Sequence, residues 1–376
     1  MRPAGILLPA LVLVLLAGCG GTSPSYPEDC GGGDACAERA PVIDGLRIEP
    51  VAENLDTPWE VAFAPDGRIF VTERPGVVRV IRNGELQKEP YAELGAEELG
   101  EGGQLGLALD PDFEENRNLY AYYTTEGESG PENRLVRLVE EDGRVVERET
   151  LLAAPADSIH NGGRVAFGPD GKLYATLGDV SQAGLAQDRE ALAGKIVRLN
   201  PDGSVPEDNP FGGSPVYSYG HRNPQGLAWD GEGNLYAPEH GQSAHDELNL
   251  IRPGQNYGWP EIEGSEDAPG LTPPVLQSGE ETWAPSGAEY VEEGPWEGSV
   301  LFTGLAGESL HRVEFDPEDP GRVVEHREYL EGEYGRLRAV EQGPDGALYL
   351  LTSNRDGRGD PAPEDDRLLK VTPSAK

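Results

Sequence analysis

The residue types best suited to chemistry lie in a short segment at positions 160–164, His-Asn-Gly-Gly-Arg. A histidine titrates near neutral pH and can take a proton from a substrate hydroxyl. The two glycines beside it leave room for a ligand to approach the imidazole ring. The segment therefore predicts His160 as a candidate general base. A histidine held in a loop by ordinary hydrogen bonds is the competing interpretation.

A second candidate is the pair Arg336 and Arg338, which flanks a single leucine. Alternate residues of a strand share one face, so both guanidinium groups point to the same side. Such a pair can hold carboxylates through two parallel hydrogen bonds. The alternative is pairing with surface acids, since the chain contains 68 Asp and Glu residues against 30 Lys and Arg.

The string EHGQSAHDE at positions 239–247 combines acidic side chains, free backbone carbonyls and a glycine kink. Hard oxygen ligands of this kind suit calcium, whereas zinc prefers histidine nitrogen. The spacing is not that of an EF-hand, so the pattern is weak by itself. Trp283 and Tyr257 can stack on a flat ligand or simply fill space. Glu101, beside two glycines, is the one member of an acidic run placed to reach a site.

One hairpin phrase recurs along the chain: an apolar strand, a turn of the Pro-Asp-Gly kind, and a second strand with an aromatic residue or Leu near its start. The copies lie at 59–73, 105–124, 163–179, 225–241, 286–304 and 337–353. Asp-Gly pairs supply the positive φ that tight hairpin turns need. The interval of roughly 45 to 70 residues fits a four-stranded blade plus a loop. The sequence therefore predicts an all-β fold, a six-bladed β-propeller with four-stranded antiparallel blades over 46–371, followed by a tail at 372–376.

In each hairpin, the residue entering the first strand and the residue leaving the second lie at the same end. Six equivalent hairpins would therefore bring these residues to one mouth of the central channel. They are Trp59, Glu60, Glu73, Arg74, Glu101, His160, Asn161, Arg164, Asp179, His221, Arg222, Asn223, Glu239, His240, Gly241, Trp283, Arg336, Arg338, Asn354 and Arg355. Histidines and arginines gathered on a chain of net charge -38 predict a pocket for an anionic, planar or polyol ligand. The same net charge argues against binding to nucleic acid or to anionic lipid.

The first residues predict export. Residues 1–18 contain an apolar run too short to span a bilayer, and end in Leu-Ala-Gly before Cys19, which resembles a bacterial lipoprotein signal. That resemblance implies cleavage before Cys19 and lipid attachment to it; an ordinary secretory signal is the alternative. Either signal predicts that the mature protein lies outside the cytoplasm, and the lipoprotein signal predicts a cell-envelope location, periplasmic or on the outer face of the membrane. The linker 19–45 is too poor in apolar residues to fold, and its Cys30 and Cys36 are expected to form a local disulfide.

Taken together, the motifs resemble the glucose/sorbosone dehydrogenase family of soluble quinoproteins, in particular its aldose sugar dehydrogenase branch. The strings run in the family's order and cover nearly all of 46–371. They are GEGGQLGLALDPDF from Gly100, HNGGRVAFGPDGKLYATLGD from His160, GKIVRLNPDGSVPEDNPF from Gly194, YGHRNPQGLAW from Tyr219, HDELNLIRPGQNYGWP from His245, WAPSG from Trp283 and RLRAVEQGPDGALYLLT from Arg336.

The resemblance implies an enzyme that binds pyrroloquinoline quinone and calcium on the propeller axis. It also implies oxidation of the anomeric hydroxyl of aldoses to lactones, with His160 as general base, hydride transfer to the quinone, and a respiratory electron acceptor. The implied quinone contacts are Glu101, Arg222, Asn223, Trp283, Arg336 and Arg338. The implied calcium ligands are the carbonyls of Gly241 and Gln242 and, at a second, structural site, Glu247 and the carbonyl of Tyr257.

The chain departs from the family's pattern at four places near the expected site, one of which is Ile159, where an acid can precede the base. Glu101 stands where a glutamine is frequent, Ala306 replaces a lysine, and Val180 stands where Gln or Arg is frequent. Losing a lysine–carboxylate contact would lower quinone affinity by roughly ten- to a hundredfold. Two other functions therefore stay open, a calcium-dependent lactonase or hydrolase and a non-catalytic ligand-binding propeller.

Overall fold

The computed structural model of the protein describes residues 42–43 and 45–373. The predicted signal peptide, the lipid anchor on Cys19 and the Cys30–Cys36 disulfide lie outside the described residues. The division of the chain at residues 18, 45 and 371 stays a prediction. No helix in the part that the structure describes is long and apolar enough to span a membrane.

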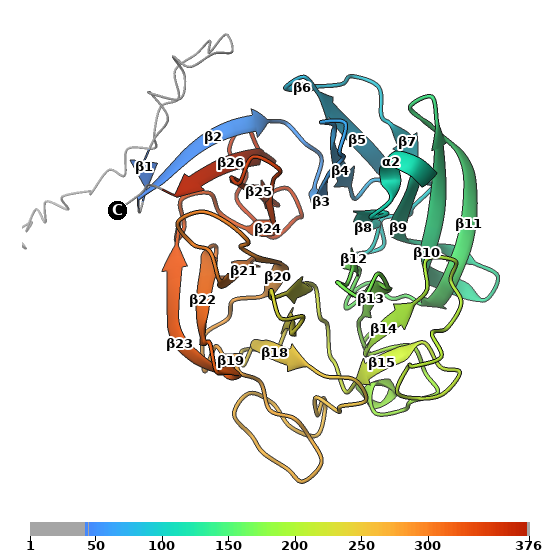
Figure 1. The fold of residues 1–376 in the computed structure, drawn as a ribbon, viewed down its shortest axis with the longest axis vertical. Helices are drawn as coiled ribbons and strands as arrows, with labels where there is room; N and C mark the ends of the chain where they lie inside the picture. The colour runs from blue at the N-terminus through green and yellow to red at the C-terminus, as the bar shows by residue number, and fades with distance from the viewer. Residues whose placement is uncertain (1–41, 44, 374–376) are drawn as a thin grey trace, which may run out of the picture. The chain divides into compact units, whose positions relative to one another are not determined.

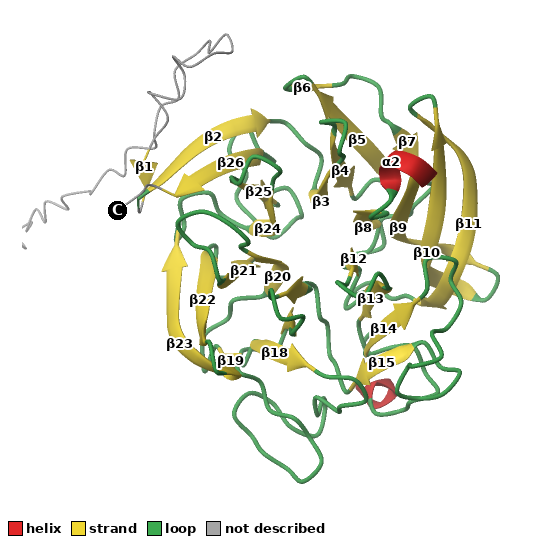
Figure 2. Cartoon of the chain, viewed as in Figure 1, coloured by secondary structure: helices red, strands yellow, loops and turns green. Residues whose placement is uncertain are grey.

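Six antiparallel sheets stand around a common centre, which confirms the predicted six-bladed β-propeller (Figure 1). Strands dominate, and the helical pieces of the described chain are the short α2 (Phe113–Asn116) and the 3-10 turn η1 (Ala183–Ala186) (Figure 2). The stretch 187–193 forms turns and loop.

Each blade begins with its innermost strand and proceeds outward, except that the last blade takes its outer strands from the N-terminus. Blade 1 contains β3 (Pro58–Phe63), β4 (Ile69–Glu73), β5 (Val77–Arg82), β6 (Glu85–Leu86) and β7 (Ala92–Glu93), and blade 2 contains β8 (Gln104–Leu109), β9 (Asn118–Gly127), β10 (Gly130–Glu141) and β11 (Arg144–Pro155). Blade 3 contains β12 (Val165–Phe167), β13 (Leu173–Leu177), β14 (Lys195–Leu199) and β15 (Val216–Tyr219), and blade 4 contains β16 (Ala228–Trp229), β17 (Leu235–Glu239), β18 (Glu247–Ile251) and β19 (Leu276–Gln277). Blade 5 contains β20 (Pro285–Tyr290), β21 (Ser299–Gly304), β22 (Leu310–Asp316) and β23 (Asp319–Tyr329), and blade 6 contains β24 (Leu337–Gln342), β25 (Leu348–Thr352), β26 (Leu368–Pro373), β2 (Leu46–Ala52) and β1 (Val42–Ile43).

Pairing of β2 with β26 closes the ring, and Figure 1 shows the blue N-terminal strand beside the red C-terminal one. The two strands are antiparallel, with Leu46 opposite Pro373 and Ile48 opposite Val371. A closed ring leaves no long unpaired sheet edge between first and last blade. The closure holds the six inner hairpins in fixed mutual positions.

The inner hairpins of blades 1, 3 and 6 turn through Pro-Asp-Gly, and those of blades 2, 4 and 5 turn through other segments rich in Asp, Glu, Gly and Pro. In blade 3, the Asp170 carboxylate accepts the backbone N–H of Lys172 at 3.0 Å, and Gly171 adopts a φ of +69°, which a side chain would disfavour. These turns form one end of the hairpins. The strand entrances and exits at the other end are therefore free to form a site.

The apolar core lies between neighbouring blades rather than at the centre of the ring. Phe70 and Val80 of blade 1, for example, pack in one cluster with Leu107 and Tyr123 of blade 2. All four side chains are at most 3% exposed. Burial on this scale stabilises the ring by roughly 1.5–3 kcal/mol for each such side chain. The site residues are therefore carried on a rigid frame.

Candidate active site

The imidazole of His160 pairs with a buried carboxylate at the mouth of the channel. His160 precedes β12 and Asp179 follows β13, so the two lie at the same end of one hairpin. His160 Nδ1 lies 2.7 Å from Asp179 Oδ1, and Asp179 Oδ2 accepts the indole N–H of Trp259 at 2.8 Å. Because Asp179 is an acceptor, the proton of the neutral ring belongs on Nδ1. The Nε2 atom is then free to accept a proton.

The backbone around His160 is held in an uncommon conformation. His160 has a φ of +60°, and its carbonyl accepts the N–H of Val180 at 3.2 Å. Gly178 makes this approach possible, because a Cβ on it would lie 2.0 Å from the His160 oxygen. On the other side, the N–H of Gly162 donates to Asn223 Oδ1 at 3.0 Å. The position of the ring is thus fixed by contacts from two blades.

Arg222 and Asn223 enter blade 4 next to this pair. The Arg222 N–H donates to the Glu239 carboxylate, and the Arg222 guanidinium lies 5.3 Å from the centre of the Trp259 ring. Asn223 is fully buried. The Nδ2 atom of Asn223 and the Nε atom of Arg222 are buried with no hydrogen-bond partner. Buried donors of this kind are normally satisfied by an acceptor, which here points to a ligand.

A pocket of about 220 Å³ adjoins the histidine through Glu101, whose carboxylate accepts the N–H of His160 at 3.2 Å. Three of its side chains are arginines. The lining residues are Arg74, Gly100, Glu101, Gln225, His240, Leu305, Arg338, Asp356, Gly357 and Arg358. Three arginines against the two carboxylates of Glu101 and Asp356 leave a small excess of positive charge on the pocket wall of a strongly acidic protein.

Arg336 and Arg338 meet around Asp356, which follows β25. Arg336 donates to Asp356 Oδ2 through Nε at 2.9 Å and Nη2 at 2.8 Å. Arg338 donates through Nη1 to Gln225 Oε1 at 2.9 Å, whereas its buried Nε has no partner. Burial lowers the pKa of Arg338 to about 9, and the positive charge of Arg336 adds to the effect. A bound anion beside Arg338 would offset the free-energy cost of burying its positive charge.

The negative charge of Glu101 is paired inside the pocket. Glu101 Oε1 accepts Arg358 Nη1 at 2.6 Å. Burial alone would raise the pKa of Glu101, but His240 and Arg358 bring it below its ordinary value. Arg358 therefore offsets the negative charge of Glu101.

The loop after β17 turns tightly around Gly241. A Cβ on Gly241 would lie 1.9 Å from the Ala244 oxygen and 2.7 Å from the His245 oxygen. The Gly241 N–H donates to Asp246 Oδ1 at 2.8 Å, and Gln242 is exposed. Crowded carbonyl oxygens in an acidic loop are donors that suit calcium. The crowded oxygens are those of Ala244 and His245, so the assignment of the Gly241 and Gln242 carbonyls as calcium ligands stays a prediction.

The second predicted calcium site holds a carboxyl group that lacks a positive partner. Glu247 accepts the N–H of Gly264 at 2.8 Å and the amide of Asn249 at 3.1 Å. Burial, with the charge of Glu239 added, raises the pKa of Glu247 to about 8. The Oε1 atom of Glu263 is also buried without a partner. A cation would compensate these carboxylates, so this group fits calcium.

Trp283 and Tyr257 pack into the protein rather than line the pocket. The Trp283 ring lies in the core of blade 5, with its centre 5.6 Å from that of Phe302. The backbone carbonyl of Trp283 accepts the N–H of Ala306 at 3.0 Å, so Ala306 lies beside the WAPSG segment that begins at Trp283. Tyr257 stacks on His221 at 4.8 Å. The implied contact of Trp283 with the quinone stays a prediction.

Three polar pocket residues are missing from the predicted mouth: Gln225, Asp356 and Arg358. Asp356 and Arg358 follow Asn354 and Arg355, the last exit residues considered. A signal was present, because the loop after the final hairpin contains the mixed acidic and basic run RDGRGD at 355–360. Had the residues leaving the last hairpin been counted as far as position 358 instead of 355, both Asp356 and Arg358 would have been included.

The sequence model of the glucose/sorbosone dehydrogenase family matches residues 55–368, so the chain belongs to this family of oxidoreductases. The resemblance found in the motifs is therefore confirmed. The chain is 31% identical over 361 residues to aldose sugar dehydrogenase YliI of Escherichia coli, spanning 87% of this chain and 93% of that one. It is 34% identical over 255 residues to quinoprotein glucose dehydrogenase B of Acinetobacter calcoaceticus, spanning 58% of this chain and 53% of that one.

A solved structure supports the same relationship. The PQQ-bound form of aldose sugar dehydrogenase from Streptomyces coelicolor superimposes with a TM-score of 0.80 at 43% identity, covering 89% of this chain and 99% of the other. The match extends through all six blades, since the family model alone reaches from the residues before β3 to the first residue of β26. The mouth described above belongs to the matched part.

Proposed function

We propose that this protein is a quinone-dependent aldose dehydrogenase that oxidises the anomeric hydroxyl of a sugar to a lactone with pyrroloquinoline quinone as cofactor. The observation that carries the proposal is the His160–Asp179 pair beside an arginine-lined pocket. Relatives named as aldose sugar dehydrogenases, one of them solved with this quinone bound, support the substrate class and the cofactor.

The pocket suits the chemistry of the quinone, a planar molecule with three carboxylates. Arg74 and Arg338 supply positive charge, Arg358 neutralises Glu101, and Arg338 keeps a buried Nε atom without a partner. Arg222 and Asn223 contribute two further unpartnered N–H groups close to His160. Carboxylate and carbonyl oxygens accept hydrogen bonds from such donors. We propose that these arginines compensate for the lysine that the family resemblance implies at the position of Ala306.

His160 is proposed to act as the base. Asp179 holds the proton of His160 on Nδ1, so that Nε2 accepts the proton of the sugar hydroxyl. The same carboxylate stabilises the imidazolium that results, and the Trp259 indole keeps the carboxylate in place. The sugar carbon must also lose a hydride, and the bound quinone supplies the two-electron acceptor.

Calcium is proposed as the second cofactor. The carbonyls of Gly241 and Gln242 would hold an ion next to the pocket, where it would polarise the quinone. Glu247 and the Tyr257 carbonyl would hold a structural ion. The buried carboxylates around Glu247 support this second assignment, because they lack a positive partner.

A cell-envelope location and a respiratory electron acceptor complete the proposal. They depend on the predicted signal at residues 1–18 and the lipid anchor at Cys19. Electrons taken from a sugar outside the cytoplasm need a membrane-associated or soluble carrier to receive them. The acidic surface, with net charge -38, suits a carrier with a basic face.

The test is reconstitution of the metal-stripped protein with quinone, calcium, or both. We expect dye-linked oxidation of aldoses only when both are present, with the lactone as product. Absence of quinone binding at micromolar concentration would overturn the proposal. Calcium-dependent hydrolysis of lactones without quinone would replace it with a hydrolase, and quinone binding without turnover would indicate a binding propeller.

A further inference from the structure

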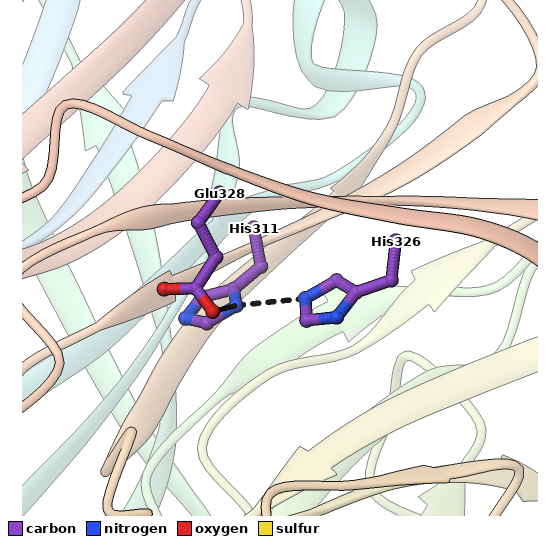
Figure 3. Close-up of side chains that lie close together, drawn as sticks. All are labelled: His311, His326 and Glu328. Atoms are coloured by element: carbon purple, nitrogen blue, oxygen red, sulfur yellow. Dashed lines mark hydrogen bonds and ion pairs between the residues drawn. The ribbon is translucent and has the colours of Figure 1, made fainter.

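Blade 5 carries a cluster of metal-ligating side chains outside the pocket lining. His311 lies on β22, and His326 and Glu328 lie on β23. In the antiparallel register His311 is opposite Glu328, and His326 precedes Glu328 by two residues, so all three side chains share one face of the sheet. Figure 3 shows them turned toward one another. Among the residues described by the structure, this is the one group of three such side chains with ligand atoms within 4.8 Å of one another.

The spacing of the ligand atoms is close to that of a tetrahedral metal site. His311 Nδ1 lies 3.0 Å from His326 Nε2, and 3.9 Å from the Oε1 atom of Glu328. Ligands that bind zinc at about 2.0–2.1 Å in a tetrahedron lie roughly 3.3 Å apart. All three ligand atoms lie within 4.8 Å of one another, so side-chain adjustments on the order of 1 Å would place one ion among them.

Ser309 orients two of these groups. Its hydroxyl lies 3.0 Å from His311 Nε2 and donates to Glu328 Oε2 at 3.1 Å. Because this hydroxyl uses its proton on the carboxylate, it accepts the proton of His311 Nε2. The lone pair of His311 is then on Nδ1, where the ion would lie. A hydrogen bond to the second ring nitrogen is a common feature of metal-binding histidines.

The surroundings keep both rings neutral and fixed. His311 is fully buried and stacks on Phe302, with ring centres 4.3 Å apart, and Trp283 packs 4.9 Å away. Burial lowers the pKa of His311 and of His326. Neutral imidazole is the form that binds metal. His326 and Glu328 are only half-buried, which leaves a path for an ion from solvent.

We propose that His311 Nδ1, His326 Nε2 and the Glu328 carboxylate bind one divalent transition-metal ion of the zinc class. Two imidazoles and one carboxylate suit zinc, whereas calcium prefers oxygen alone. Three protein ligands leave a fourth position for water. The ion would clamp β22 to β23 behind Trp283, and this structural role is separate from the proposed function because it does not involve the quinone.

The test is a Zn²⁺ titration of the full chain by calorimetry. Cysteines are alkylated first and calcium is present in excess, so that thiolates and oxygen sites do not compete. We expect wild-type protein to bind one Zn²⁺, and His326→Asn and Glu328→Gln each to bind it at least tenfold more weakly. Ser309→Ala should weaken binding roughly ten- to a hundredfold. Near-UV circular dichroism checks that each variant is folded.

Glu325→Gln is the matched control, because Glu325 lies on the same strand with its side chain on the opposite face. It should bind Zn²⁺ as the wild type does. Co²⁺ provides a second measurement, and the wild type should show the intense visible bands of tetrahedral coordination. The proposal is overturned if the wild type binds no Zn²⁺, or if His326→Asn and Glu328→Gln bind it unchanged. An octahedral, oxygen-type Co²⁺ spectrum would also overturn it.

Discussion

Asp179 holds His160 through a 2.7 Å contact between its Oδ1 atom and His160 Nδ1, and its other oxygen is fixed by Trp259. The carboxylate is 2% exposed, so water does not compete for it. The pair thus sets which ring nitrogen of His160 can accept a proton. A change at Asp179 should alter catalysis without removing the base.

We predict that Asp179→Asn lowers kcat roughly 10²- to 10⁴-fold, because an amide can present its NH₂ group and favour the wrong imidazole tautomer. The quinone dissociation constant should change by less than threefold, which separates an effect on the base from loss of the site. Trp259→Phe removes the hydrogen bond from the indole to Asp179 Oδ2 and leaves the His160–Asp179 contact in place. It should therefore lower kcat by a smaller factor than Asp179→Asn does. An Asp179→Asn enzyme with wild-type kcat would exclude this role.

Gly178→Ala should damage the site through a single methyl group. The added Cβ would lie 2.0 Å from the His160 carbonyl and 2.8 Å from Asn223 Oδ1. We expect a loss of about 1–3 kcal/mol in the free energy of unfolding, and a fall in kcat because the His160 loop must move. Gly184→Ala is the control, since a Cβ there has no neighbour within 4 Å. Equal behaviour of the two variants in denaturant titrations would contradict the packing described.

Arg358→Ala should weaken quinone binding because it leaves the charge of Glu101 uncompensated. Arg358 is about half exposed, and an exposed pair contributes at most about 1 kcal/mol. We therefore expect a two- to fivefold rise in the dissociation constant, measured by fluorescence quenching. Glu101→Gln in the same background should recover the affinity. Failure of that second change to recover it would show that Arg358 acts on the ligand rather than through Glu101.

Stability should fall with rising pH because of two carboxyl groups near the axis. Glu289 and Glu341 are hydrogen-bonded to each other, and burial raises the pKa of Glu289 to about 8 and that of Glu341 well above its ordinary value. Between about pH 4.5 and 8 the folded protein binds more protons than the unfolded chain. The free energy of unfolding is therefore unaffected by these two groups below pH 4.5. It decreases as the pH rises toward 8, because the folded protein must then bury ionised carboxylates.

Glu289→Gln removes one of these titrations. We expect its Tm to exceed that of the wild type by ~2–4 °C at pH 8, equivalent to about 1 kcal/mol, and to match it at pH 5. Glu147→Gln, at an exposed position, should leave the Tm unchanged at both pH values. A gain for Glu289→Gln of the same size at pH 5 and pH 8 would show that packing, not protonation, is responsible.

The hairpin repeats were sufficient to predict the fold, because a turn such as Pro-Asp-Gly is a local signal that reappears at each blade. The same repeats predicted the mouth, since entrances and exits of equivalent hairpins share one end. His160 and Asp179, separated by 19 residues in one hairpin, were therefore placed on one side. Geometry within a hairpin is readable from sequence.

Side-chain contacts between residues of different blades could not be predicted from the sequence in this way. Arg358 and Glu101 are 257 residues apart, and their contact depends on ring closure. The direction of the Trp283 side chain was equally hidden, because its core position follows from packing against Phe302 and His311. The cluster on blade 5 was missed because the outer strands β22 and β23 lie outside the repeated hairpin. Side-chain pairing across a sheet requires the register, which the repeat does not contain.

The most direct measurement is the anaerobic reduction of bound quinone by an aldose, followed by stopped-flow absorbance in wild-type protein and in His160→Gln. Both proteins are loaded with quinone and calcium to the same occupancy. We predict that the wild type reduces its bound quinone completely in a single turnover after the aldose is added. The His160→Gln variant should do so at least a hundredfold more slowly. Equal rates, or no reduction in the wild type, would contradict the assignment of His160 as the base of a quinone-dependent sugar dehydrogenase.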